Sequence, residues 1–244
     1  AMSKCYMCPR ECSVDRENGE RGFCSVGNEY IIGSADLHFW EEPCISGERG
    51  SGAIFFSGCN LRCVFCQNKD ISRDPVGKKY TEDELIDKML ELQDRGAHNI
   101  NLVTATPYSL FLSKTLAKVK AKGLNIPIVY NTSGYEAVET LKMLEGYVDI
   151  YLPDFKYSDN ALAKEYSFAP DYVNTASLAI DEMVRQAGSP VFDDNGIMQK
   201  GVIVRHLILP NHTKNSIGVL EILKERYDNY LKFYSSVKQT VKKY

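Results

Sequence analysis

The chain has 244 residues and a formal net charge of −3, with 44% hydrophobic and 25% charged residues. This length suits one large domain with a small appendage. The slightly acidic balance disfavours binding to nucleic acid or to an anionic membrane. No apolar run approaches the ~18 residues of a transmembrane helix, so no membrane partner is expected.

Residues 1–48 form a lead rich in cysteine and glycine, with little hydrophobic periodicity. Four of its cysteines are closely spaced: Cys5, Cys8, Cys12 and Cys24. Four thiolates make a closed metal site, which fits an iron–sulfur cluster or a structural zinc. Because the polar start of the chain predicts no secretion signal, we expect metal binding in a reducing cytoplasm rather than disulfides. Cys44 belongs to neither cysteine group and is expected to be a buried, apolar-like side chain, with a reactive thiol near the site as the alternative.

The apolar run at residues 53–58 ends in glycine and predicts a buried strand. It is followed by Cys59-Asn-Leu-Arg-Cys63-Val-Phe-Cys66, with three cysteines in CxxxCxxC spacing. Three thiolates hold three irons of a 4Fe–4S cluster, whose complete set needs four ligands. One iron is then open to a ligand that is not protein. The competing interpretation, a zinc knuckle, uses four ligands in paired spacing. Arg62, inside this loop, is expected to be exposed.

From residue 53 onward strand and helix signals alternate, which predicts a parallel α/β architecture. Strands are expected at residues 53–58, 99–104, 126–131, 148–153 and 202–209. Helices are expected at about residues 81–95, 109–122, 136–145 and 172–187. Thr81-Glu-Asp-Glu84 is a capping box that opens the first of them. A glycine follows each of the first three helices, in the position typical of a helix end.

Asp194-Asn195-Gly196 predicts a hairpin turn before the fifth strand. No convincing sixth strand follows, because residues 217–227 and 230–244 both read as helical or irregular. Five strands with crossover helices predict most of a partial (β/α)6 barrel. After residue 210 the barrel either closes differently or lacks a segment near residues 227–230.

The cysteine motif resembles the signature of the radical S-adenosylmethionine (SAM) enzymes, and the chain is similar to the pyruvate formate-lyase activating enzymes over about residues 50–215. The resemblance implies a partial (β/α)6 radical-SAM barrel with a cysteine-rich N-terminal extension. It implies that Cys59, Cys63 and Cys66 hold a 4Fe–4S cluster whose open iron is chelated by the amino and carboxylate groups of SAM. One electron would then cleave SAM to a 5′-deoxyadenosyl radical. The expected division is a metal-binding segment and a barrel, at residues 1–48 and 49–244.

The same resemblance assigns contacts to SAM. The run Asn131, Thr132, Ser133, Gly134 is similar to a SAM-binding Thr-Asn-Gly turn preceded by Asp, so Asn131 keeps a hydrogen-bonding group but loses the charge. Asp154-Phe155-Lys156 resembles an Asp-Leu-Lys that approaches the SAM ribose and carboxylate, and a lysine there supplies a charge-assisted donor. An ordinary surface ion pair between Asp154 and Lys156 is the competing interpretation. Strand alternation and resemblance place Arg205 in the lumen near SAM, with His206 structural. Two further candidates are an aromatic that shields the cluster and a loop histidine, Phe65 and His212.

One stretch departs from the family pattern. Activating enzymes carry a Gly-Gly-Glu motif after the second strand, where the SAM amino group is bound. This chain reads Val103-Thr104-Ala105-Thr106-Pro107 there, with no acid. Thr104, Thr106 or backbone carbonyls would have to replace it.

The resemblance also carries expectations about partners. Relatives often have an auxiliary cluster for electron transfer, which favours iron–sulfur over zinc in the N-terminal segment. The implied substrate is a backbone glycine of a partner enzyme, with a reductant such as flavodoxin or ferredoxin. The alternatives are radical modification of a small molecule or another peptide, and a non-catalytic iron–sulfur protein that carries electrons or senses oxygen. Formation of 5′-deoxyadenosine separates the last from the enzymes.

Overall fold

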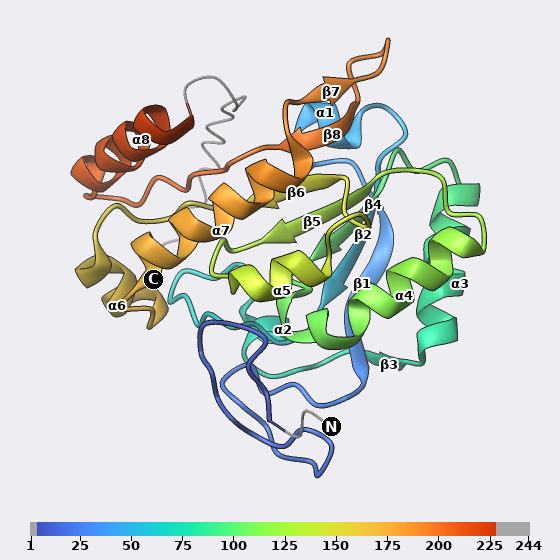
Figure 1. The fold of residues 1–244 in the computed structure, drawn as a ribbon, viewed down its shortest axis with the longest axis horizontal. Coiled ribbons are helices and arrows are strands. Elements are labelled where there is room, and N and C mark those ends of the chain that lie inside the picture. Colours follow the sequence, from blue (N-terminus) through green and yellow to red (C-terminus); the bar gives the residue numbers. More distant parts are fainter. Residues whose placement is uncertain (1–3, 228–244) are drawn as a thin grey trace.

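The computed structural model describes residues 4–227, so the predicted segment at 230–244 lies outside the described residues. In the described part, one eight-stranded sheet runs in the order β3-β1-β2-β4-β5-β6-β8-β7 (Figure 1). Its centre is a run of parallel neighbours: β2 (Ser51–Phe56), β4 (Ile100–Val103), β5 (Ile128–Thr132), β6 (Ile150–Pro153) and β8 (Met198–Val202). This open parallel sheet with crossover helices is the partial barrel expected from the sequence.

Antiparallel strands extend the sheet at both edges: β1 (Tyr30–His38) on β2, β3 (Lys78–Tyr80) on β1, and β7 (Val191–Phe192) on β8. The pairing of β7 with β8 confirms the predicted hairpin. By contrast, β1 was not predicted. Its first three residues are all buried and the rest do not alternate regularly, so the period of two that marks a strand in sequence is lost.

The fifth predicted strand, at residues 202–209, is wrong in its bounds. β8 begins earlier, at Met198, and ends at Val202. Beyond it the backbone N–H groups of Ile203 and Arg205 still donate to β6, but only an isolated bridge remains, between Arg205 and Asp154. The chain then leaves the sheet because the His206 ring is held on its outer side by Phe155 and Ser216.

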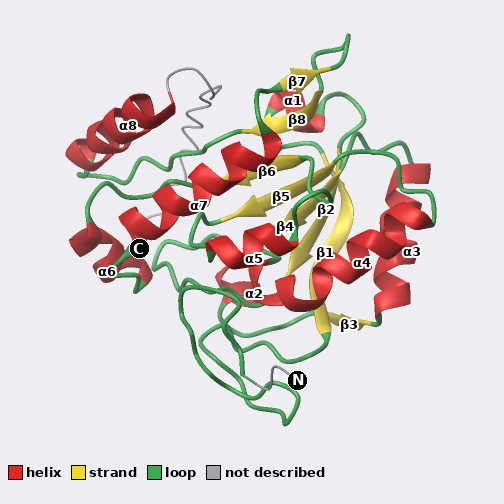
Figure 2. Cartoon of the chain, viewed as in Figure 1, coloured by secondary structure: helices red, strands yellow, loops and turns green. Residues whose placement is uncertain are grey.

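Helices cover the outer face of the sheet (Figures 1 and 2). The four that were predicted are α3 (Glu82–Asp94), α4 (Ser109–Ala121), α5 (Val138–Met143) and α7 (Tyr172–Ala187). The capping box at Thr81 is confirmed, with both reciprocal hydrogen bonds present. Further helices are α2 (Lys69–Ser72), α6 (Asn160–Ser167), α8 (Thr213–Tyr227) and a short 3-10 helix (Thr106–Tyr108). Among residues 4–227, no helix is both long and apolar enough to cross a lipid bilayer.

The inner face of the sheet is covered by the segment that carries α1 (Pro43–Ser46). There Cys44, buried as predicted, and Ile45 form a second apolar cluster with residues of the inner face: Val129, Ile150, Leu152, Met198 and Ile203. The buried Asn99 fixes this segment, because its amide donates to the Ile45 carbonyl (2.8 Å) and accepts from the Ser51 hydroxyl (2.6 Å). The segment is therefore tied to the start of β2.

We expect Asn99→Ala to lower the free energy of unfolding by about 1–3 kcal/mol, because it leaves two buried polar partners without hydrogen bonds. The measurement is anaerobic urea unfolding followed by circular dichroism. Asn125→Ala is the matched control, since Asn125 is exposed. Equal unfolding midpoints for the two variants would contradict the assigned role.

Candidate active site

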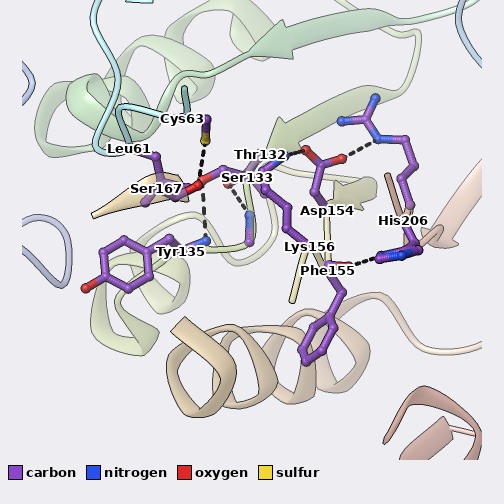
Figure 3. Close-up of polar contacts among 12 residues, drawn as sticks. Leu61, Cys63, Thr132, Ser133, Tyr135, Asp154, Phe155, Lys156, Ser167 and His206 are labelled. Atoms are coloured by element: carbon purple, nitrogen blue, oxygen red, sulfur yellow. Dashed lines mark hydrogen bonds and ion pairs between the residues drawn. The ribbon is translucent and has the colours of Figure 1, made fainter. Parts of the chain in front are cut away.

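The three-cysteine loop follows β2 at the carboxyl end of the parallel strands, where barrel active sites form. Hydrogen-bond donors lie close to two of its sulfur atoms. The Leu61 N–H points at Cys59 Sγ (3.3 Å). The Ser167 hydroxyl points at Cys63 Sγ (2.9 Å), a contact that can be followed in Figure 3. Donors aimed at sulfur suit metal-bound thiolates, since outer-shell hydrogen bonds orient and tune ligands.

Burial and the charge of Lys156 act in opposite directions on the thiols of this loop. Burial raises the pKa of Cys59 and Cys63, while the Lys156 ammonium acts in the opposite direction on both. A bound metal removes the thiol proton outright. The donor set therefore fits a 4Fe–4S cluster on Cys59, Cys63 and Cys66. Within residues 4–227, no three His, Cys, Asp or Glu side chains converge on one point suited to a single metal ion. A four-iron cluster binds each thiolate to a different iron.

A charged group from β6 and β8 lies beside the loop. The Asp154 carboxylate pairs with the Lys156 ammonium, and its other oxygen accepts from Arg205 Nε at 2.9 Å (Figure 3). Arg205 Nη2 also donates to the Asn131 amide oxygen, at 2.6 Å. These side chains are 12–22% exposed, so the pair is not the surface ion pair of the competing interpretation.

The group keeps its charges despite burial. Burial acts to raise the pKa of Asp154, but the adjacent Arg205 and Lys156 hold that pKa below its ordinary value. For Lys156, burial opposes charge, but Asp154 raises the pKa above the ordinary value. The site therefore presents an ionised acid between two fixed cations.

The turn after β5 approaches this group closely. Gly134 has φ of +79°, and a side chain there would place Cβ 2.2 Å from the Asp154 carbonyl oxygen. The Ser133 and Asp154 carbonyls both accept from the Tyr172 hydroxyl, at 2.7 and 2.9 Å. Thus the structure brings the predicted turn and the predicted Asp154 together, and only glycine fits between them.

Sequence reasoning missed a buried acid, Glu136, two residues beyond Gly134. Its carboxyl accepts hydrogen bonds from the hydroxyls of Thr106, Thr132 and Tyr130. Burial raises its pKa to about 7, although these hydroxyls act to lower it. The stretch Val103–Pro107, which lacks the acid of the Gly-Gly-Glu motif, therefore has the carboxyl of Glu136 beside it, supplied by the loop after β5. A glutamate just after a strand-end turn was the available signal.

The remaining predicted residues lie around the loop. Phe65 is half-buried and packs against the main core. His212 meets the Tyr166 hydroxyl at 2.9 Å, on α6, rather than the Asp154 group. His206 is buried between the Phe155 carbonyl and the Ser216 hydroxyl, as expected of a structural histidine.

The N-terminal cysteines share one cavity, lined by Cys5, Cys8, Cys12 and Cys24 among others. Gly22 allows this packing, because a Cβ there would lie 2.9 Å from Cys12 Sγ. The next residue, Phe23, points its N–H at that sulfur (3.3 Å). Burial raises the pKa of Cys8 to about 12 in the absence of metal. The four thiols therefore line one space, although in this structure they do not converge on a single point.

The N-terminal segment packs directly on the three-cysteine loop. Arg10 donates to the Asn60 carbonyl (2.8 Å) and to Ser167 (3.2 Å), the residue that contacts Cys63. Arg62 is not exposed as predicted, because its guanidinium donates to the Phe23 carbonyl (2.9 Å) and lies over the Phe23 ring. Gly58 also approaches the backbone of Cys24, which leaves no room for a side chain.

The fold and the three-cysteine loop are those of the radical SAM enzymes. The family model of the Radical SAM superfamily matches residues 53–221, which is more than half of the chain. The chain therefore belongs to this superfamily.

Among individual relatives, an uncharacterized protein of Methanocaldococcus jannaschii is 34% identical over 86% of this chain and 58% of its own length. The chain thus spans less than two thirds of that relative. The pyruvate formate-lyase-activating enzyme of Clostridium pasteurianum is 32% identical over 44% of this chain and 46% of its own. The crystal structure of Streptococcus suis SuiB matches 78% of this chain and 40% of that chain, with a TM-score of 0.45 and 16% identity.

We expect Arg10→Gln to loosen the three-cysteine loop, because it removes contacts to Asn60 and Ser167. After anaerobic reconstitution and desalting, the variant should release iron several-fold faster than wild type, followed with an iron chelator. Arg73→Gln, at an exposed position close to the loop, is the control. Identical release rates for the three proteins would argue against a bracing role.

We expect Glu136 to make stability fall as pH rises. Its pKa is about 7 in the folded chain against an ordinary value of 4.5, so the native state holds the extra proton between these values. Stability is then lost from about pH 4.5 to 7, by roughly 3 kcal/mol in total. Urea unfolding across this range should show wild type losing stability relative to Glu136→Gln. A constant difference between the two would show that Glu136 is not protonated in the fold.

Proposed function

We propose that this protein reductively cleaves SAM and uses the resulting radical to abstract hydrogen from a substrate, in the manner of a glycyl-radical-enzyme activating protein. The observation that carries the proposal is the position of Lys156. Its buried ammonium pairs with the Asp154 carboxylate, and its positive charge acts to lower the pKa of the Cys63 thiol. An anionic group that chelates an iron beside these cysteines would meet a buried cation.

Each part of the site has a defined task in this proposal. Cys59, Cys63 and Cys66 ligate three irons and leave the fourth open. Bound together, the cluster and SAM supply one electron and a carbon radical, chemistry that side chains do not offer. Lys156 is suited to the carboxylate of SAM, and Asp154 holds that lysine in place. The turn at Thr132–Gly134 offers backbone groups close to Asp154.

The N-terminal cysteines are proposed to hold a second iron–sulfur cluster that passes electrons from a flavodoxin or ferredoxin. The packing of Gly58 against Cys24 supports this role, because the two cysteine segments touch without an intervening element. A structural zinc is the alternative, and it would brace the same contacts. Both centres need reduced thiols, which suits a reducing cytoplasm.

The proposed substrate is a glycine in the backbone of a partner enzyme. The similarity to the activating enzyme of Clostridium pasteurianum supports it, over less than half of this chain. A small molecule or another peptide is the alternative substrate. A glycyl-radical signal on a candidate partner, read by electron paramagnetic resonance, would separate them.

With dithionite and SAM, anaerobic wild type should form 5′-deoxyadenosine, and Cys59→Ala/Cys63→Ala/Cys66→Ala should form none. One electron from dithionite would split SAM into methionine and a 5′-deoxyadenosyl group, and without substrate that group would take a hydrogen atom from buffer or protein to give the measured 5′-deoxyadenosine. Cys44→Ala is the control and should remain active. Iron and zinc are measured on all three, so the metal left in the triple variant identifies the N-terminal centre. A fully iron-loaded wild type without product would favour the non-catalytic iron–sulfur alternative.

A further inference from the structure

Two acids from the segment after β1 point into the barrel. The side chains of Glu41 and Glu42 are each only 8% exposed. Their carboxylates face Arg205 Nη1 from 4.0 and 3.9 Å, which is beyond direct hydrogen-bond distance. Because the segment precedes the first parallel strand, sequence analysis did not connect these acids with the site.

Arg205 does not satisfy these acids, because its other nitrogens serve Asp154 and Asn131. Glu41 has a neighbour in His38, whose ring nitrogen lies 2.9 Å from its carboxylate. Glu42 differs, since its Oε2 is enclosed and has no hydrogen-bond partner among the described residues. An enclosed carboxylate oxygen without a donor is costly, and so points to a ligand that brings one.

The charge of the group supports the same conclusion. Glu41, Glu42 and Asp154 are acids, whereas Arg205 and Lys156 supply two positive charges. The acids thus outnumber the lysine and the arginine by one in a site that is largely buried. A ligand that carries a positive charge would balance this group.

An independent observation comes from the floor of the same face. Asn101 is fully buried, and both polar atoms of its amide lack partners among the described residues. It is paired with Val129, which packs against Ile45 on the inner face, so Asn101 belongs to that face too. Asn131 follows Val129 on that side by two residues. Polar groups without partners therefore lie at two places among the described residues of this region, on β4 and in the segment before α1.

The order of contacts decides between SAM and substrate. Three charged side chains separate Glu42 from the three-cysteine loop: Lys156 pairs with Asp154, Asp154 pairs with Arg205, and Arg205 faces Glu42. By resemblance, the SAM amino group would bind the open iron, beside the cysteines. We therefore assign Glu42 to the substrate rather than to SAM.

We propose that Glu42, with Glu41 and Arg205 beside it and Asn101 on the same face of the sheet, forms a subsite that binds a primary ammonium group of the radical substrate. Only the identification of this ligand as the radical substrate rests on the proposed function. The ammonium belongs either to a small amine or to a lysine side chain of a protein. In both cases its N–H groups meet the enclosed Glu42 oxygen and its charge balances the site.

The test uses the reconstituted full chain saturated with S-adenosylhomocysteine. Binding of n-butylammonium, Nα-acetyl-lysine amide and 1-butanol is measured by calorimetry. We expect the two cations to bind and the alcohol not to bind, and we expect Glu42→Gln to weaken both cations by about tenfold or more. Tighter binding of the blocked lysine indicates a protein substrate, and tighter binding of butylammonium indicates a small amine.

Two further variants serve as controls for the binding test. Glu48→Gln, an exposed acid on the same segment, should bind as wild type does. Asn101→Leu should weaken the cations yet raise the thermal midpoint of the ligand-free protein, because it removes the buried unpaired amide. Cations that bind no better than butanol, or equally to Glu42→Gln, overturn the proposal.

The inference and the proposed function fail separately. Affinity for S-adenosylhomocysteine is measured alongside, and the proposal requires Glu42→Gln to bind it as wild type does. If Glu42→Gln instead loses affinity for S-adenosylhomocysteine, the acid serves the cofactor and the proposal is wrong. If wild type forms no 5′-deoxyadenosine, the proposed function fails while the binding comparison still decides the subsite.

Discussion

The ionised carboxylate of Asp154 is the interaction on which the site depends. It lies at the end of β6 and joins Lys156, which faces the cysteine loop, to Arg205, which faces the barrel interior. Without that carboxylate, two buried cations would repel each other across the site. The close fit of Gly134 against the Asp154 carbonyl fixes the acid from the other side. Asp154 thus sets the positions of both Lys156 and Arg205.

A second constraint is the packing of the N-terminal segment against the three-cysteine loop. Three non-glycine residues around its cysteines, Glu11, Ser13 and Ser25, adopt positive φ. Such conformations persist only where surrounding structure enforces them. Here the backbone N–H groups of Glu11, Ser13 and Ser25 donate to carbonyls of the same segment, those of Cys8, Cys5 and Gly22. Arg10 and Arg62 in turn join this segment to the three-cysteine loop, so the two cysteine segments are packed against each other.

The sequence predicted the parts of the fold that rest on local chemistry. The helix that starts at Thr81 and the hairpin before β8 follow from capping and turn residues, and both are confirmed. The strand β1 and the end of β8 could not be predicted, because pairing partners and the anchoring of His206 decide them. In the site, the motif residues Asp154 and Arg205 were found from spacing and resemblance. Their roles towards SAM remain predictions.

The acids missed in sequence share one physical cause. Glu136 reaches the stretch without an acid from a neighbouring loop, and Glu42 reaches the barrel interior from outside the parallel strands. Neither belongs to a motif, so only the fold brings them to the site. The hydrogen-bond partners of Glu136 and Glu42 also differ, and this difference separates a structural acid from one proposed to bind a ligand. Three hydroxyls satisfy Glu136, whose carboxyl can hold its own proton, whereas Glu42 faces a guanidinium too distant for a hydrogen bond. An acid with all its partners supports the turn, and an acid lacking one is left to bind a ligand.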